Sequence, residues 1–306
     1  MGKKFKKLQS MIKILYIGVH SHLEWGAEFW LIKAFKDINL MYDLLDYRKD
    51  FQNFNNNQIN SIIYSKSKEC DLIFLQRGDY LYPQIFNNIT IPIVFWSTEP
   101  IQLKNDVDRL LNSNIFSWVY VHSYSCLERI TNEFPHLNSK TSIMHNAAPK
   151  EKIQFSDKKN IFSIFNRSLS LRRRFWLLPS RKIINIVKGI YGNEYFRYLR
   201  SAKIAINIHY SKKNLDDFES GIFEAMASGC LVISERLNKQ TLMDLDMEKA
   251  IIQVSTPVEL YKKLKFFKDN PDLIQSYQLE NKNAINKNTW HDRAKMMKIK
   301  FKEICN

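Results

Sequence analysis

Residues 205–234 read AINIHYSKKNLDDFESGIFEAMASGCLVIS and carry the strongest evidence about the fold. Alternating isoleucines predict a buried strand, a polar loop follows, and a helix is expected from Ser220 and Gly221 onward, with a second strand after Gly229. The first turn of such a helix offers unpaired backbone N–H groups and the positive end of the helix dipole, which favour a diphosphate. Glu224 lies one turn inside, where its carboxylate can accept two hydrogen bonds from a ribose diol.

Strand and helix signals alternate along the rest of the chain. Strands are expected at residues 12–18, 41–47, 72–76, 91–96, 118–121, 141–144, 161–166, 203–208, 230–234 and 250–254. Helical patterns lie between them, including one around residues 180–191. Such alternation predicts an α/β protein whose parallel sheets carry helices on both faces. Residues 147–160 interrupt it with Pro149, four lysines and few apolar side chains, so we expect a linker there.

Composition narrows the class of protein. Of the 306 residues, 45% are hydrophobic and 25% charged, which is ordinary for a folded chain. No apolar run approaches the roughly 20 residues of a membrane-spanning helix, and residues 1–10 do not resemble a secretory signal. The four cysteines are far apart, so we expect a reduced, cytoplasmic location and no zinc site. The basic segment 1–10 is compatible with peripheral contact to an anionic membrane at the inner face, or with a plain flexible tail.

The positive charge is uneven along the chain. The formal net charge is +15, of which residues 1–150 carry +3 and residues 151–306 carry +12. The second half is therefore the expected home of an anionic ligand, such as nucleotide phosphates. Compositional drift toward Lys and Asn explains the same excess equally well, and both interpretations stay open.

The stretch FEAMASGCLVI at residues 223–233 resembles the donor-site helix of GT-B glycosyltransferases, in particular glycosyltransferase family 4 and its CgeB-like branch. That family has an E-x7-E pattern in which the second Glu binds the nucleotide ribose and the first contacts the donor sugar. Glu224 matches the second position, and Asp216 stands at the first. Asp216 keeps the carboxylate with a shorter reach, and Asp217 or Glu219 takes its role if the loop is shifted.

Weaker matches follow the family's order along the chain. They are Trp25-Gly26-Ala27-Glu28, Trp96-Ser97-Thr98-Glu99-Pro100, His145-Asn146-Ala147-Ala148-Pro149, the pair Arg167 and Arg172, and Thr289-Trp290-His291-Asp292-Arg293-Ala294. The resemblance implies two Rossmann-like, doubly wound domains that face a cleft: an acceptor domain at 1–149, a donor domain at 150–286, and a helix at 287–306 that crosses back onto the first domain.

The resemblance also implies an activity. It predicts a hexosyl transfer from a nucleotide-diphosphate sugar, a UDP-sugar, to an unidentified acceptor, with retention of configuration and without a metal or other cofactor. A metal-free enzyme must neutralise the departing diphosphate with fixed cations and helix N–H groups. The expected catalytic residues are Asp216, Arg167, Arg172 and Glu99, and the expected donor-binding residues are Glu224, Ser220, Gly221, Arg167, Arg172, His209 and Asn146.

Two other functions remain compatible with the sequence. The basic excess fits an enzyme that glucosylates a nucleic acid, whose binding would fall steeply with salt. The Asp216 departure fits a degenerate GT-B protein that binds glycans or nucleotides without turnover. At the residue level, Glu224 fits a simple helix cap, Arg167 and Arg172 fit surface charges, and His209 fits a buried, hydrogen-bonded core position. His20, His22 and Glu99 follow expected strands of the first domain and are candidates to face the acceptor.

Overall fold

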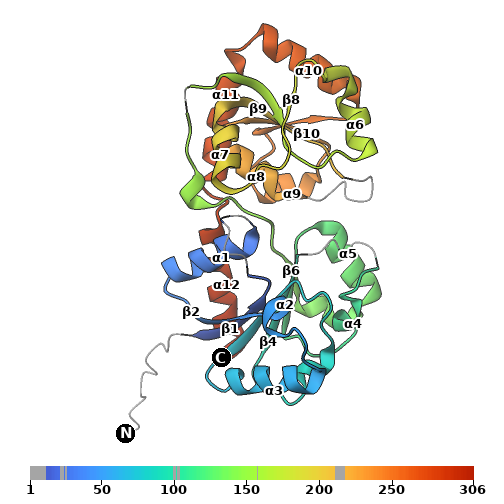
Figure 1. Cartoon of the computed structure of the whole chain (residues 1–306), viewed down its shortest axis with the longest axis vertical. Coiled ribbons are helices and arrows are strands. Elements are labelled where there is room, and N and C mark those ends of the chain that lie inside the picture. Colours follow the sequence, from blue (N-terminus) through green and yellow to red (C-terminus); the bar gives the residue numbers. More distant parts are fainter. Residues whose placement is uncertain are drawn as a thin grey trace.

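The computed structural model describes residues 12–20, 24, 26–98, 101, 104–156, 158–210 and 218–306. The chain forms two lobes, each built on one parallel sheet with helices on both faces (Figure 1). We call residues 12–143 the N-terminal lobe and residues 161–285 the C-terminal lobe. The predicted α/β class with two doubly wound sheets is confirmed.

The N-terminal lobe contains a six-stranded sheet in the order β2-β1-β3-β4-β5-β6. Its strands are β1 (Lys13–Gly18), β2 (Met41–Asp46), β3 (Leu72–Gln76), β4 (Ile93–Ser97), β5 (Trp118–Val121) and β6 (Thr141–Ile143). Its helices are α1 (Ala27–Asp37), α2 (Tyr47–Asp50), α3 (Asn56–Ser67), α4 (Asp108–Leu111) and α5 (Tyr124–Glu133), with 3-10 turns η1 (Pro83–Phe86) and η2 (Pro135–Lys140). β3 and β4 are buried along their whole length, as expected for central strands covered on both faces.

The C-terminal lobe contains a five-stranded sheet in the order β11-β10-β9-β7-β8. Its strands are β7 (Ile161–Phe165), β8 (Asn185–Ile186), β9 (Ala202–Asn207), β10 (Leu231–Glu235) and β11 (Ile251–Val254). Its helices are α6 (Leu171–Leu177), α7 (Gly192–Ser201), α8 (Ser220–Ala227), α9 (Lys239–Asp244), α10 (Pro257–Asp269) and α11 (Leu273–Ile285), with the 3-10 turns η3 (Lys150–Lys152) in the linker and η4 (Leu178–Ser180) after α6.

Both sheets reverse their strand order at one point. β1 lies beside both β2 and β3, and β7 lies beside both β8 and β9. Connections leave such a pair of strands toward opposite sides, which opens a crevice at their carboxyl ends where ligands of doubly wound folds bind. Each lobe therefore has one switch point, between β1 and β3 in the first and between β7 and β9 in the second.

The prediction of a helix around residues 180–191 is wrong. This segment forms the short edge strand β8, in which Asn185 and Ile186 pair with Ile164 and Phe165 of β7. The helix lies earlier, at α6, where the Ser170 hydroxyl caps the first turn by accepting from the Arg173 backbone N–H. A short apolar run is compatible with either a buried strand or a helix. This one forms a strand because its backbone pairs with β7.

Helix α12 (Trp290–Cys305) crosses back onto the N-terminal lobe, as the sequence predicts (Figure 1). Its apolar face carries Trp290 and Phe301, whose rings lie 5.7 Å from Trp96 and 5.6 Å from Phe74. The chain crosses between lobes twice at the same place, because the backbone of Ala148 bonds to that of Asn288 at 2.9 Å and to that of Trp290 at 3.0 Å. None of the helices in the described part of the chain has the length and apolar character that a membrane crossing demands.

We expect Phe301→Ala to destabilise the protein by roughly 3–5 kcal/mol, because it leaves a cavity between α12 and the first sheet. Urea unfolding measures this difference. Ile299→Ala on the same helix, 61% exposed, is the control and should change the free energy of unfolding by less than about 0.5 kcal/mol. Equal midpoints for the two variants would contradict the docking of α12.

Candidate functional site

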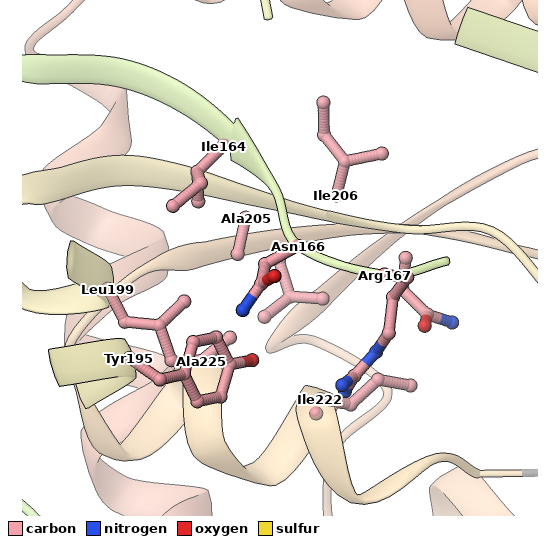
Figure 2. A pocket seen from close by; sticks show the side chains of 12 residues that line it. Ile164, Asn166, Arg167, Tyr195, Leu199, Ala205, Ile206, Ile222 and Ala225 are labelled. Carbon is pink, nitrogen blue, oxygen red and sulfur yellow. The ribbon is translucent and has the colours of Figure 1, made fainter. Parts of the chain in front are cut away.

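The switch point of the second sheet brings together the residues that the sequence singled out. Arg167 follows β7 directly, and α8 begins after the loop that leaves β9. In Figure 2, Arg167 extends from the end of β7 toward Ile222 at the start of α8. A Cβ built on Gly221 would overlap the Arg167 guanidinium, so this position in α8 accepts only glycine while Arg167 keeps its place. The arginine thus lies against the N-terminal turn of the helix.

Two carboxylates hold the Arg167 guanidinium in this position. Its Nε lies 3.5 Å from Glu219 Oε2, and its Nη2 lies 3.9 Å from Glu224 Oε2. Burial opposes the charge of Arg167, but Tyr195, Glu224 and Glu219 offset it and raise the pKa of the guanidinium above its usual value. Arg167 is therefore a permanent cation beside the positive end of a helix dipole, an arrangement that attracts an anion.

Glu224 lies in a more apolar setting than its ion pair suggests. Burial raises the pKa of its carboxyl, while Arg167 and a hydrogen bond with Tyr195 act in the opposite direction. Burial also raises the pKa of the Tyr195 hydroxyl, so the tyrosine stays protonated. Tyr195 comes from α7, so three separate elements converge on this carboxylate.

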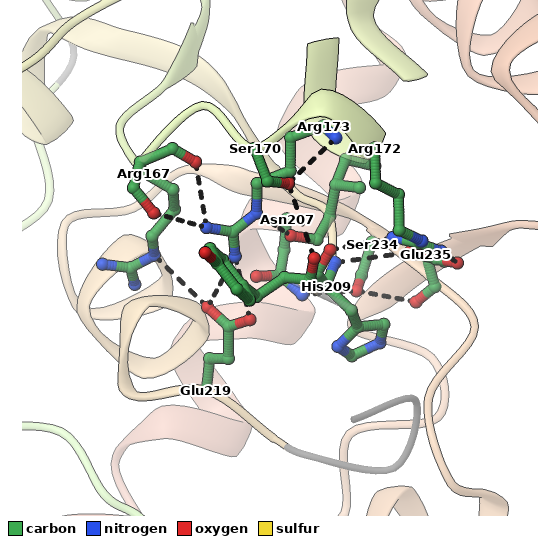
Figure 3. Close-up of polar contacts among 12 residues, drawn as sticks. Arg167, Ser170, Arg172, Arg173, Asn207, His209, Glu219, Ser234 and Glu235 are labelled. Atoms are coloured by element: carbon green, nitrogen blue, oxygen red, sulfur yellow. Dashed lines mark hydrogen bonds and ion pairs between the residues drawn. The ribbon is translucent and has the colours of Figure 1, made fainter. Parts of the chain in front are cut away.

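Arg173 is a member of the site that the sequence did not single out. Its Nη2 donates to both carboxylate oxygens of Glu219, at 3.1 and 3.4 Å, while Nε donates to the carbonyl of Ile208 at 2.7 Å (Figure 3). Its Nη1 also donates to the carbonyl of Ser168 at 3.2 Å. Arg173 is 3% exposed, so it fixes Glu219, which in turn faces Arg167. The Ser170 cap of α6 is the local signal that would have oriented Arg173.

Arg172 points away from this group. Its Nη1 donates to the carbonyl of His209 at 2.8 Å, and its Nη2 forms an ion pair with Glu235 at the end of β10 (Figure 3). His209 is fully buried, and its Nε2 lies 3.0 Å from the carbonyl of Arg236. Arg172 and His209 therefore support the carboxyl ends of β9 and β10, and neither lines the cavity described next.

A cavity of about 560 Å³ opens beside Arg167. Its walls come from both lobes: Gly26 of the N-terminal lobe, residues 166–168 after β7, residues 188–192 after β8, Tyr195, Ser220 and Glu224. The cavity meets the size typical of a site for a small ligand. Of the predicted donor-binding residues, Arg167, Ser220 and Glu224 line it, and Gly221 lies beneath Arg167.

Asn146 belongs to the crossing between the lobes. Its Nδ2 donates to the carbonyl of Phe218, just before α8, at 3.1 Å. Arg293 of α12 donates to the carbonyls of His145 and Asn146 at 3.0 and 3.2 Å, and burial lowers its pKa to about 10. Asn146 thus acts on the site through the segment that leads into α8.

A second polar contact joins the lobes near this crossing. Asp244 of α9 accepts from the Tyr124 hydroxyl at 2.6 Å and lies 3.2 Å from His145 Nε2. Burial is the main cause that lowers the pKa of His145, so the ring is neutral at pH 7. Tyr124 begins α5, and this contact therefore fixes the N-terminal lobe to α9 of the C-terminal lobe.

Several predicted residues lie outside the described residues. These are Asp216 and Asp217, between β9 and α8 in the sequence, His22 and Trp25, after β1, and Glu99 and Pro100, after β4. His20 is described, and its backbone N–H donates to Asp46 at 3.1 Å. Within the described ranges, one group of possible metal ligands occurs, Asp37, Glu151 and His291. His291 of α12 pairs with Asp37 of α1, and none of the three residues lines the cavity.

Comparisons with known proteins agree with this architecture. Residues 165–298 match the family model described as "Glycosyl transferase-like". No curated protein sequence matches the chain. The structure is similar to a glycosyltransferase from Rickettsia africae, with 12% identity and a TM-score of 0.68 over 96% of this chain and 98% of that one.

Two further solved structures share the arrangement of both lobes. Alr3699/HepE from Anabaena, in complex with UDP and glucose, has 10% identity and a TM-score of 0.69 over 94% of this chain and 99% of that one. The β-glucosyltransferase of phage T4 has 14% identity and a TM-score of 0.57 over 96% of this chain and 100% of that one. These likenesses show the fold, and the predicted GT-B architecture is confirmed.

We expect Glu224→Gln to raise the thermal midpoint at pH 7. Because burial raises the pKa of this carboxyl in the folded state, its charged form costs stability, and that cost grows as pH rises through the folded pKa. The gain should disappear toward pH 4, where the wild-type carboxyl is protonated.

Asp79→Asn is the matched control with the opposite sign. Burial alone would raise the pKa of Asp79, but Tyr47, Arg48 and Arg77 outweigh it and lower the pKa. Its charge therefore stabilises the fold above the unfolded pKa, and its neutralisation should lower the midpoint at pH 7. A loss of stability in both variants would contradict the assignment of Glu224 as a residue kept at a cost to stability.

Proposed function

We propose that the protein is a glycosyltransferase that moves a sugar from a nucleotide-diphosphate sugar, a UDP-sugar, to a separate acceptor. The observation that carries this proposal is the position of Arg167 on Gly221 at the start of α8, with Glu224 one turn further on, all at the edge of the interlobe cavity. The family model that covers residues 165–298 and the UDP bound in Alr3699/HepE support the same assignment.

The proposed reaction makes specific demands on the site. The bond between the anomeric carbon and the diphosphate oxygen breaks, the electron pair stays on the diphosphate, and an acceptor hydroxyl supplies the new oxygen and loses its proton. Negative charge grows on the leaving diphosphate. Arg167 and the N–H groups of the first turn of α8 stabilise it, because both are fixed before the reaction begins.

The positions of Glu224 and of the cavity wall also indicate where the nucleoside binds in this proposal. The Glu224 carboxylate accepts hydrogen bonds from the ribose hydroxyls, and Tyr195 orients it from the opposite side. The loop at residues 188–192 is the part of the cavity wall left for the base. Asp216 contacts the donor sugar in this proposal, on the strength of the family resemblance. Retention of configuration, independence from metal ions and the CgeB-like assignment have the same support.

The first test is a hydrolysis screen with UDP-, GDP- and dTDP-sugars in the absence of acceptor, combined with calorimetric titration of UDP. We expect turnover of a UDP-sugar and a loss of UDP affinity of about 100- to 10,000-fold in Glu224→Ala, the range for two hydrogen bonds to a charged group at about 1.5–3 kcal/mol each. Glu280→Ala, an exposed carboxylate on α11, is the control and should match wild type.

Full activity of Glu224→Ala would overturn the proposal. UDP binding without turnover of any donor would favour the degenerate, binding-only protein. The same assay in the presence of EDTA, with proton NMR of the released sugar, tests metal independence and retention.

A double-mutant cycle tests the contact between Gly221 and Arg167. Gly221→Ala should weaken UDP binding by displacing the guanidinium, and Arg167→Ala should weaken it by removing the charge. Because both act through one group, the double variant should bind UDP about as weakly as Arg167→Ala alone. Additive losses in the calorimetric affinities would mean that Gly221 acts on the ligand by itself.

A further inference from the structure

The N-terminal lobe has its own switch point, between β1 and β3. All strands of the first sheet are parallel, so the carboxyl ends of β1 and β3 lie on the edge from which β6 leads into the linker. Gly26, in the connection that leaves β1, lines the donor cavity of the C-terminal lobe. This edge therefore faces the side on which the donor is proposed to bind.

The backbone after β3 is held in a rare conformation. Arg77 and Tyr80 have φ values of 74° and 65°, in the left-handed region that non-glycine residues seldom adopt, and Gly78 has 80°. A Cβ on Gly78 would approach Leu110 to 2.9 Å, so the chain is packed tightly against the core at this point. Such strain persists where the surrounding structure imposes it, and it is concentrated at functional sites. Here it turns the Tyr80 ring outward, 73% exposed.

A second tyrosine lies beside it. Tyr82 is 49% exposed, and the Arg109 guanidinium lies 4.5 Å from the centre of its ring. The Arg48 guanidinium lies 5.9 Å from the centre of the Tyr80 ring. Two flat rings, each with an arginine at one face, thus lie in the segment that follows β3. We call Arg48, Arg77, Tyr80, Tyr82 and Arg109 the tyrosine surface.

Each arginine of the tyrosine surface is paired with a carboxylate. Asp79, 9% exposed, accepts from Arg48 and from Arg77, and also from the Tyr47 hydroxyl. Asp106 pairs with Arg109 and accepts the backbone N–H of Tyr80 at 2.6 Å. The surface therefore offers fixed hydrogen-bond donors and acceptors with little net charge.

This balance of charge discriminates between ligand classes. A nucleic-acid backbone requires cations that are free to replace its counterions, and here the arginines already have carboxylate partners. A sugar ring presents an apolar C–H face, which packs on an aromatic ring, and a rim of hydroxyls, which bond to fixed donors and acceptors. We propose that the tyrosine surface binds the acceptor and that the acceptor is an uncharged sugar. This inference rests on the proposed function for the direction of transfer.

The test is saturation-transfer NMR with the methyl α- and β-glycosides of glucose, galactose, mannose and N-acetylglucosamine, each added to the full-length protein. We expect at least one glycoside to bind, and Tyr80→Ala and Tyr82→Ala each to weaken it by about tenfold. Tyr64→Ala is the matched control: this tyrosine is 43% exposed on α3 and has Lys68 Nζ 4.5 Å from its ring centre. It should leave binding unchanged.

Hydrolysis of the UDP-sugar, measured on the same samples, separates the two proposals. Tyr80→Ala should hydrolyse the donor at the wild-type rate, because the tyrosine surface does not line the donor cavity. Binding of no glycoside, or equal binding by wild type and both variants, would overturn the inference. Binding of a double-stranded DNA oligonucleotide that Tyr80→Ala abolishes would also overturn it, in favour of a nucleic-acid acceptor. Glycoside binding without any donor turnover would support the surface and contradict the proposed function.

Discussion

The structure of the donor-side site depends on one contact, the Arg167 guanidinium packed on the Cα of Gly221. A cation at the N-terminal turn of a helix is unfavourable, because the dipole is positive at that end. Glu219 and Glu224 offset this cost from two sides, and Arg173 holds Glu219 in place. The result is a permanent cation at the N-terminal turn of a helix, an arrangement that favours the binding of an anion.

Three other parts of the chain hold α8, and with it the contact between Arg167 and Gly221, in position. Arg293 on α12 binds the carbonyls of the linker, and Asn146 in the linker binds the segment before α8. Tyr195 reaches Glu224 from α7. Since α12 is packed into the N-terminal lobe through Phe301 and its neighbours, the position of α8 is coupled to both lobes.

The strand pattern and the acidic residue of α8 were predictable because they depend on local periodicity and on helix-start signals, whereas the back-crossing of α12 was implied by the family resemblance alone. The pairing of Arg173 with Glu219 was not. Arg172 and Arg173 are neighbours on α6, where successive side chains diverge by about 100° around the axis. The sequence pattern placed this helix later, around residues 180–191. Because the true start of α6 was not known, the direction of neither side chain relative to Arg167 could be predicted. The edge strand β8 was not predicted for a related reason: a strand of two residues is too short to show an alternating hydrophobic pattern.

The two switch points share one topology and differ in electrostatics. At the carboxyl ends of β7 and β9, the Arg167 guanidinium lies beside the first turn of α8. The N–H groups of a first turn lack partners within the helix, so an anion can bind to them and to Arg167 together. Near β1 and β3, the cations already form ion pairs: Arg48 and Arg77 share Asp79, and Arg109 pairs with Asp106. A charged ligand gains little there, because it must separate existing ion pairs, whereas a hydroxyl inserts beside them as donor and acceptor at once. In the proposed transfer, the edge at β7 and β9 holds the phosphate-activated sugar and the edge at β1 and β3 holds the acceptor that supplies the hydroxyl.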